Sequence, residues 1–238
     1  MRIKVSLLAR KGDVVDFNHC QDLSREIRRA INASNPGIFS NPSAELYTFS
    51  RLLVKNRMFE ITREGMKLQT NQLHFFFSSE NPEVCKSLID GLVEKESIRI
   101  KNVTLEVSGI EIIKESRISG REKFVTLSPI NAETNYRKME LWEFEEKFTR
   151  ELFEELKRRL RILKGSVGDV RFKTRILKLK PVRIRLESGF MRAYLMVFNA
   201  EGSEELLKIG YTTGFGKMTD MGFGMVKTTL GSPKTDNT

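Results

Sequence analysis

Apolar and polar residues alternate at the start of the chain. Ile3, Val5 and Leu7 are separated by polar side chains within residues 2–9. A period of two is the pattern of a strand that buries one face. We therefore predict a half-buried strand over these residues.

A helical period follows. Leu23, Ile27 and Ile31 predict a helix over residues 22–33, and a second amphipathic helix is predicted from Pro82. Further strands are predicted over residues 46–53, 58–62, 72–78, 97–100 and 103–114. The order strand, helix, strands, helix, strand is ferredoxin-like, and many RNA-binding modules share it.

The second half of the chain follows a polar stretch, residues 117–123, that is predicted to be a linker. Apolar residues then recur every three or four positions over residues 142–163. This spacing predicts a long amphipathic helix, whose outer face ends in Lys157-Arg158-Arg159.

Basic and apolar residues alternate over residues 171–186, but the alternation slips at Leu177. Pro181 lies in the gap, where a central strand could not tolerate it. We predict two strands, or a bent hairpin, with basic side chains outward. A strand over residues 193–198 and a short helix over 203–208 complete a second mixed α+β unit.

The charge of the chain points to an anionic partner. The net charge is +10, and residues 150–185 hold 13 basic and 4 acidic residues. Lysine and arginine gain affinity for a polyanion by releasing phosphate counterions, so nucleic acid is the natural candidate. A solvated basic face without a ligand is the alternative that charge alone leaves open.

Other classes of protein receive no support. No apolar run is long enough for a transmembrane helix, and a cytoplasmic location without membrane association is expected. Cys20, Cys85, His19 and His74 lack metal-ligand spacing, so no metal or cofactor is predicted. His74, which precedes three phenylalanines, is interpreted as a structural strand residue.

Glycines cluster over residues 210–227. Thr219 stands where a dinucleotide motif needs its last glycine, and Tyr211 stands where a Walker A loop begins with glycine. Both motifs are therefore excluded. The stretch is predicted to be a loop that approaches phosphates with its backbone, or else a glycine-rich hairpin at a sheet edge.

This stretch resembles the C-terminal signature of the CRISPR-associated repeat endoribonucleases, a family within the repeat-associated mysterious protein (RAMP) superfamily. The signature has two glycine pairs, a basic residue after the first, and a Met-Gly-Phe-Gly ending. Here these are Gly214 and Gly216, Lys217, and residues 221–224. Residues 17–19, 34–36, 46–50 and 124–130 also resemble the family.

The resemblance implies two tandem ferredoxin-like domains, over residues 1–118 and 124–230. The last residues, 231–238, are predicted from the sequence itself to be a disordered tail. It also implies that repeat RNA lies in a basic groove between the domains, near the glycine-rich loop. The residues then expected to contact RNA are Arg25, Arg28, Arg29, Lys173, Arg175, Lys178, Lys180, Arg183, Arg185, Gly214, Gly216, Lys217, Gly222 and Gly224.

Active members of the family are metal-independent and use a tyrosine, a histidine and a lysine. The corresponding positions are here Arg28, Asn41 and Glu45. The ribose 2′-hydroxyl needs a base, the leaving oxygen needs an acid, and the transition state needs a cation. The expectation is therefore a non-catalytic paralogue without catalytic residues of the usual kind.

Three other functions stay open. The chain could be an active endoribonuclease with a rearranged site, a structural subunit of a CRISPR interference complex, or a generic RNA-binding module. The expected partners are CRISPR repeat RNA and, for a subunit, other CRISPR-associated proteins. The sequence does not distinguish a monomer from a homodimer.

Overall fold

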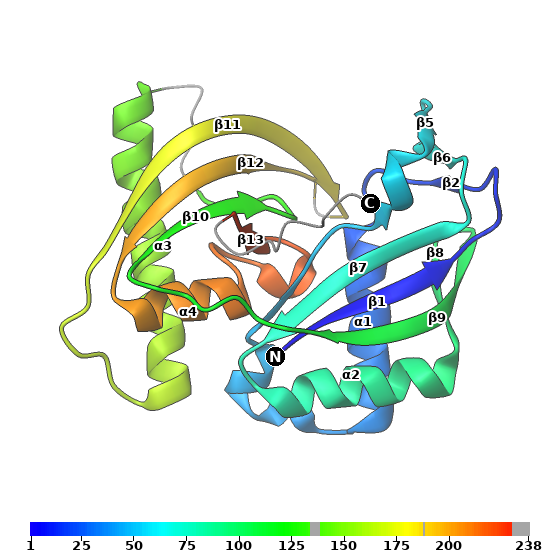
Figure 1. The fold of residues 1–238 in the computed structure, drawn as a ribbon, viewed down its shortest axis with the longest axis horizontal. Helices are drawn as coiled ribbons and strands as arrows, with labels where there is room; N and C mark the ends of the chain where they lie inside the picture. Colours follow the sequence, from blue (N-terminus) through cyan, green and yellow to red (C-terminus); the bar gives the residue numbers. More distant parts are fainter. Residues whose placement is uncertain (134–138, 188, 230–238) are drawn as a thin grey trace, which may run out of the picture.

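Two large hydrophobic cores and one small cluster around Ile184 and Phe223 organise the described part of the chain. The computed structural model describes residues 1–133, 139–187 and 189–229. One core gathers buried residues between Ile3 and Leu105, and the other gathers residues between Ile118 and Val226. Figure 1 shows the two corresponding units side by side. Within the described ranges, no helix is long and apolar enough to cross a membrane.

The first unit contains a six-stranded antiparallel sheet. Its strands are β1 (Arg2–Leu8), β3 (Tyr47–Phe49), β4 (Leu53–Val54), β7 (Gln72–Ser79), β8 (Ser97–Ile100) and β9 (Val103–Ile113). They run in the order β3-β7-β1-β9-β8, and β4 also pairs with β7. With α1 and α2 inserted after the first and third main strands, this is the order expected of a ferredoxin-like unit.

Both helices cover the same face of this sheet. Leu23 and Ile27 of α1 (Cys20–Ser34) are buried in the core that also holds the apolar residues of β1. The second helix, α2 (Pro82–Lys95), begins where the side chain of Asn81 accepts a 3.0 Å hydrogen bond from the Glu83 N–H. The two helices and the half-buried first strand confirm the sequence pattern.

The prediction of one continuous strand over residues 46–53 is wrong, because the structure has two strands there, β3 and β4. The Ser50 hydroxyl accepts a 2.9 Å hydrogen bond from the Phe76 N–H and donates a 2.8 Å one to the Arg51 carbonyl. A side chain therefore takes the place of a backbone partner, and the strand divides into β3 and β4. A separate sheet consists of β2 (Val14–Val15), β6 (Met66–Leu68) and β5 (Phe59–Ile61). Of these three strands, the sequence analysis predicted only β5.

The second unit repeats the element order. Its elements are β10 (Arg121–Thr126), α3 (Leu141–Lys164), β11 (Phe172–Leu186), β12 (Gly189–Gly202), α4 (Glu204–Thr213) and β13 (Val226–Thr228). The sheet order β11-β12-β10-β13 again places the first and third main strands in the middle. The α+β class is thus confirmed. The predicted linker was too long, because β10 already begins at Arg121.

The strand β11 is continuous, which corrects the prediction of two strands. The register with β12 shifts at Leu177, where one extra residue forms a bulge. Pro181 is tolerated because β11 is the edge strand of its sheet. Figure 1 shows β11 and β12 as a long curved hairpin whose tip reaches the first unit. The tip is tied there by a 3.1 Å hydrogen bond from the Arg185 N–H to Asn18 Oδ1.

Candidate nucleic-acid interface

Four basic side chains project from one face of β11. Lys173 and Arg175 alternate with Phe172 and Ile176, which are buried on the face that packs against α3. Beyond the bulge, Lys178 and Lys180 continue on the same side as Lys173 and Arg175. All four are exposed, and none has an ion-pair partner in the part of the chain that the structure describes.

The strand register adds two lysines that sequence reasoning missed. Arg175 lies opposite Asn199 of β12, which in turn lies opposite Lys123 of β10. In the next row of paired residues across the sheet, a valine of β12 and a valine of β10 lie between Lys178 of β11 and Lys227 of β13. Only the pairing of distant strands brings these side chains together, so periodicity could not find them. We call this surface the basic sheet face; it consists of Lys123, Lys173, Arg175, Lys178, Lys180 and Lys227.

Arg183 and Arg185 do not belong to this surface. The bulge at Leu177 places the odd-numbered residues that follow it on the opposite side of the hairpin. Arg183 stacks on the exposed ring of Phe190, with 3.7 Å between its guanidinium carbon and the ring centre. The six basic residues predicted for this segment therefore occupy two faces rather than one.

The arginines of α1 are exposed but paired with carboxylates. Arg25 contacts Asp22 at 2.6 Å and Glu187 of the hairpin tip at 2.7 Å. Arg29 contacts the buried Glu26 at 3.0 Å. These side chains reach solvent, as predicted, but their charge is already compensated within the protein. They therefore attract phosphate less than the unpaired cations of β11 do.

Arg28 and Glu45, which the sequence resemblance assigned to two of the three catalytic positions, form an ion pair with each other. The two guanidinium nitrogens donate to the two carboxylate oxygens at 2.9 and 2.7 Å. The guanidinium also lies 4.2 Å above the ring of Phe39. Hydrogen bonding to Glu45 raises the pKa of Arg28 above its ordinary value. The pair is a closed, neutral unit rather than a free cation.

The third position, Asn41, has a structural role. Its side chain accepts a 3.0 Å hydrogen bond from the Ser43 N–H and begins the short 3₁₀ helix η2 (Pro42–Glu45). Tyr47, the nearest phenol in sequence, has a fully buried side chain, and burial raises its pKa. Both side chains are thus engaged within the protein, Asn41 at the start of η2 and Tyr47 in the first core.

A pocket of about 300 Å³ lies beside the ion pair, between the two units. Glu45, Glu155 and Asp220 contribute carboxyl groups to its lining. Burial and the neighbouring charge of Glu45 raise the pKa of Asp220. Arg158 and Arg159 line the pocket as well and pair with Glu155 at 2.6 and 3.2 Å, so the lining carries charges of both signs.

The glycine-rich stretch begins as a helix, contrary to the predicted loop. Helix α4 extends through Gly210 to Thr213, five residues beyond the predicted end. The four later glycines, Gly214, Gly216, Gly222 and Gly224, are buried. A Cβ on Gly224 would lie 2.1 Å from the Phe215 carbonyl oxygen, so this glycine allows close backbone packing. In this structure the glycines face protein rather than solvent.

Direct phosphate binding by this loop stays a prediction, and several of its backbone N–H groups already donate to carbonyls within the protein. The Phe215 N–H donates to the Gly224 carbonyl, and the Gly224 N–H donates to the Pro129 carbonyl, each at 2.9 Å. Lys217 is exposed and forms an ion pair with Glu133. The hydrogen bond to Glu133 raises the pKa of Lys217.

Arg159 holds the glycine-rich loop from α3, which corrects its predicted outward position. Its side chain is 1% exposed and donates to the carbonyls of Thr213, Gly214 and Gly216. Burial lowers its pKa to about 10. Its position three residues after Leu156 places it on the apolar stripe, a signal that the run of basic residues obscured.

The fold and these surfaces define an α+β protein with two similar units and an exposed basic sheet face. Residues 113–228 match the family model described as CRISPR associated protein Cas6, C-terminal. Residues 14–111 match the model described as CRISPR-associated protein Cas6, N-terminal. The chain belongs to the Cas6 family.

Three relatives illustrate the range of the family. The chain is 32% identical to a putative CRISPR-associated endoribonuclease-like protein, Cas6nc, of Pyrococcus horikoshii, covering 95% of this chain and 99% of the relative. It is 30% identical to the CRISPR-associated endoribonuclease Cas6 of Pyrococcus furiosus, covering 95% and 89%. A solved structure of a RAMP protein binding different RNA substrates superposes with a TM-score of 0.85 at 29% identity, covering 96% and 99%.

Proposed function

We propose that this chain binds CRISPR repeat RNA, in a groove between two ferredoxin-like domains of residues 1–118 and 124–230, and does not cut it. The observation that carries the proposal is a contrast in charge. The cations of the basic sheet face are unpaired within the described residues, whereas Arg28 at the family catalytic position is neutralised by Glu45.

Binding follows from the unpaired cations. Each lysine or arginine that meets a phosphate releases counterions, which gives affinity without a requirement for base sequence. The RAMP relative that binds different RNA substrates supports this role by its similar fold. Sequence preference then depends on contacts with unpaired bases, as is usual for RNA.

Loss of cutting follows from the missing groups. General acid and base catalysis contribute roughly 10²–10⁴-fold each when a group is positioned beside the reacting oxygen. At the three family positions the chain offers an ion-paired arginine, an amide and a carboxylate. The similarity to a relative named as endoribonuclease-like supports the same conclusion.

An active enzyme with a rearranged site is the second candidate, and Asp220 is the observation in its favour. Its carboxyl group lines the interdomain pocket and has a raised pKa, so it could donate a proton to a leaving oxygen. The similarity to the endoribonuclease of Pyrococcus furiosus agrees with this candidate.

One experiment tests both candidates. The purified protein is incubated with end-labelled repeat RNA in EDTA, and retention and cleavage are followed together. Retention of the repeat over a shuffled RNA of equal length, without cleavage, supports the proposal. A single cut leaving a 2′,3′-cyclic phosphate refutes it, and loss of that cut in Asp220→Asn would identify the acid. Equal retention of both RNAs would indicate a generic RNA-binding module.

A further inference from the structure

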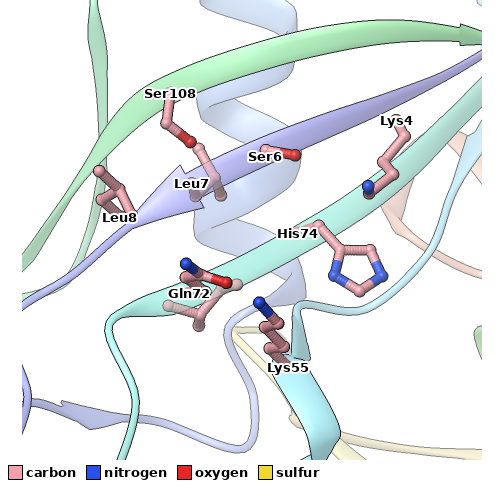
Figure 2. Close-up of a pocket in the computed structure, with 9 residues that line it drawn as sticks. Lys4, Ser6, Leu7, Leu8, Lys55, Gln72, His74 and Ser108 are labelled. Atoms are coloured by element: carbon pink, nitrogen blue, oxygen red, sulfur yellow. The ribbon is translucent and has the colours of Figure 1, made fainter.

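A hollow of about 450 Å³ lies on the face of the first sheet that α1 and α2 leave uncovered. Figure 2 shows its lining residues, which come mainly from the adjacent strands β1 and β7. Six of its nine lining residues have polar side chains, namely Lys4, Ser6, Lys55, Gln72, His74 and Ser108, and Leu7, Leu8 and Leu73 complete the lining. None of these residues belongs to the basic sheet face.

The strand register explains why the surface is hollow. Ser6 of β1 lies between His74 of β7 and Gly109 of β9, so no large side chain lies on that side of the imidazole ring in this row of paired residues. The pairing of β1 with β9 shifts after Ser6, and Ser108 is the extra residue of this bulge. The result is a depression beside one aromatic ring rather than a flat sheet surface.

The ring of His74 has a defined orientation. It meets the ring of Phe76 edge-on, with the centres 5.3 Å apart and the planes at 85°. Burial, together with the nearby charge of Lys4, lowers the pKa of His74, which favours the neutral imidazole. A neutral, oriented and half-buried ring offers a flat face on which a nucleobase can stack.

Two amines flank this ring. Figure 2 shows His74 between Lys4 and Lys55. Lys4 Nζ forms an ion pair with Glu111 Oε1 at 3.2 Å. Lys55 has no ion-pair partner among residues 1–133, 139–187 and 189–229. Gln72 adds an amide that can donate to and accept from a base edge. A stacking ring, cations for phosphate and an amide are the groups by which sheet surfaces hold single-stranded RNA.

The hollow begins where contact between the two units ends. Arg2, on the same side of β1 as Lys4, donates a 2.8 Å hydrogen bond to the Tyr211 carbonyl and stacks on its ring. The second unit therefore covers the first residue of β1 and leaves the strand open from Lys4 onward.

From these observations we propose that the hollow is a subsite for one unpaired nucleotide of bound RNA, with the base stacked on His74 and the flanking phosphates near Lys4 and Lys55. The proposal rests on the proposed RNA-binding function and adds a site outside the basic sheet face. It also assigns a ligand to a histidine that its sequence context marked as structural.

The test uses labelled oligouridylate and oligoadenylate as probes, with binding to the full chain followed by fluorescence anisotropy. His74→Ala removes the ring and is expected to weaken binding about tenfold, whereas His74→Phe keeps a stacking face and should stay within about threefold of the native protein. Lys4→Ala is expected to weaken binding and flatten its salt dependence. Lys86→Ala, an exposed lysine on α2, is the matched charge control and should change neither.

Each outcome has a distinct meaning. If the native protein binds neither the probes nor the repeat, the proposed function fails and the subsite fails with it. If the native protein binds RNA and His74→Ala binds equally well, the subsite is refuted while the proposed function stands. Equal weakening in His74→Ala and His74→Phe, with both variants folded by circular dichroism, would refute stacking. Crosslinking of 4-thiouridine RNA to β7 would support the subsite, and crosslinks confined to the second unit would overturn it.

Discussion

At the scale of single residues, partners decide the role of each charge. The sequence resemblance assigned Arg28, Asn41 and Glu45 to the family's catalytic positions, but it did not predict the ion pair between Arg28 and Glu45. That pair depends on how the two short 3₁₀ helices η1 (Ile38–Ser40) and η2 return the chain to α1. Alternation and spacing describe single helices and strands, so they do not predict that the chain after α1 turns back and brings Glu45 to Arg28.

Arg159 gives the residue-scale prediction. Replacing it with methionine keeps most of the side-chain volume but leaves the loop carbonyls at Thr213, Gly214 and Gly216 without their buried donor. Unsatisfied buried groups are costly, so we expect a loss of about 3 kcal/mol in the free energy of unfolding, measured by urea denaturation. Arg158→Met is the control, because Arg158 is exposed and should cost about 0.5 kcal/mol or less. Equal costs would contradict a holding role for Arg159.

At the scale of elements, the helices and the first strand followed directly from periodicity, while β11 did not. Its alternation breaks at Leu177 because the strand contains a bulge, and a broken alternation in sequence has the same appearance as two strands. The basic side chains of its first half were identified correctly as exposed. Their neighbours Lys123 and Lys227 required the pairing of β10 and β13, which no local pattern specifies.

The basic sheet face gives the element-scale prediction. Replacing Lys173, Arg175 and Lys178 together with alanine should weaken RNA binding at least tenfold. It should also reduce the slope of log affinity against log salt by about two, because three phosphate contacts are lost. Binding is measured by filter retention over a salt series.

The control for this variant removes the same charge from the other side of the sheet. Arg150, Arg158 and Arg161 lie on α3 and are exposed. Their replacement with alanine should leave the slope within about half a unit of the native value. An equal fall in both triple variants would mean that net charge, rather than the basic sheet face, determines affinity.

At the scale of the whole molecule, the glycine-rich stretch joins the two units. The Thr48 hydroxyl donates a 2.9 Å hydrogen bond to the Phe223 carbonyl, and the Ser24 hydroxyl donates a 2.7 Å one to the Asp220 carbonyl. Gly222 lies against Phe49 of β3, where a Cβ would come within 2.7 Å of the ring. The sequence resemblance located this stretch near a groove, but its contact with the first sheet depends on tertiary packing.

Two glycines with nearly equal φ give the molecule-scale prediction. Gly222 and Gly165 have φ of 84° and 78°, but a Cβ on Gly165 would meet nothing within 4 Å. Gly165→Ala should therefore cost about 1 kcal/mol in the free energy of unfolding, from backbone strain alone. Gly222→Ala should cost about 2 kcal/mol more, because the methyl group overpacks the contact with Phe49. Equal values from urea denaturation would show that this contact does not couple the units.

The bulge in β11 also determines where the hairpin can lose a residue. Ile176 and Lys178 already face successive residues of β12, Phe198 and Val197, so deletion of Leu177 would leave every other side chain on its present face. Deletion of Leu179 would instead turn Lys180 toward the second core, opposite Met196. Loss of one residue at Leu177 is therefore compatible with this architecture. Loss of one residue elsewhere in the strand exchanges buried for exposed positions.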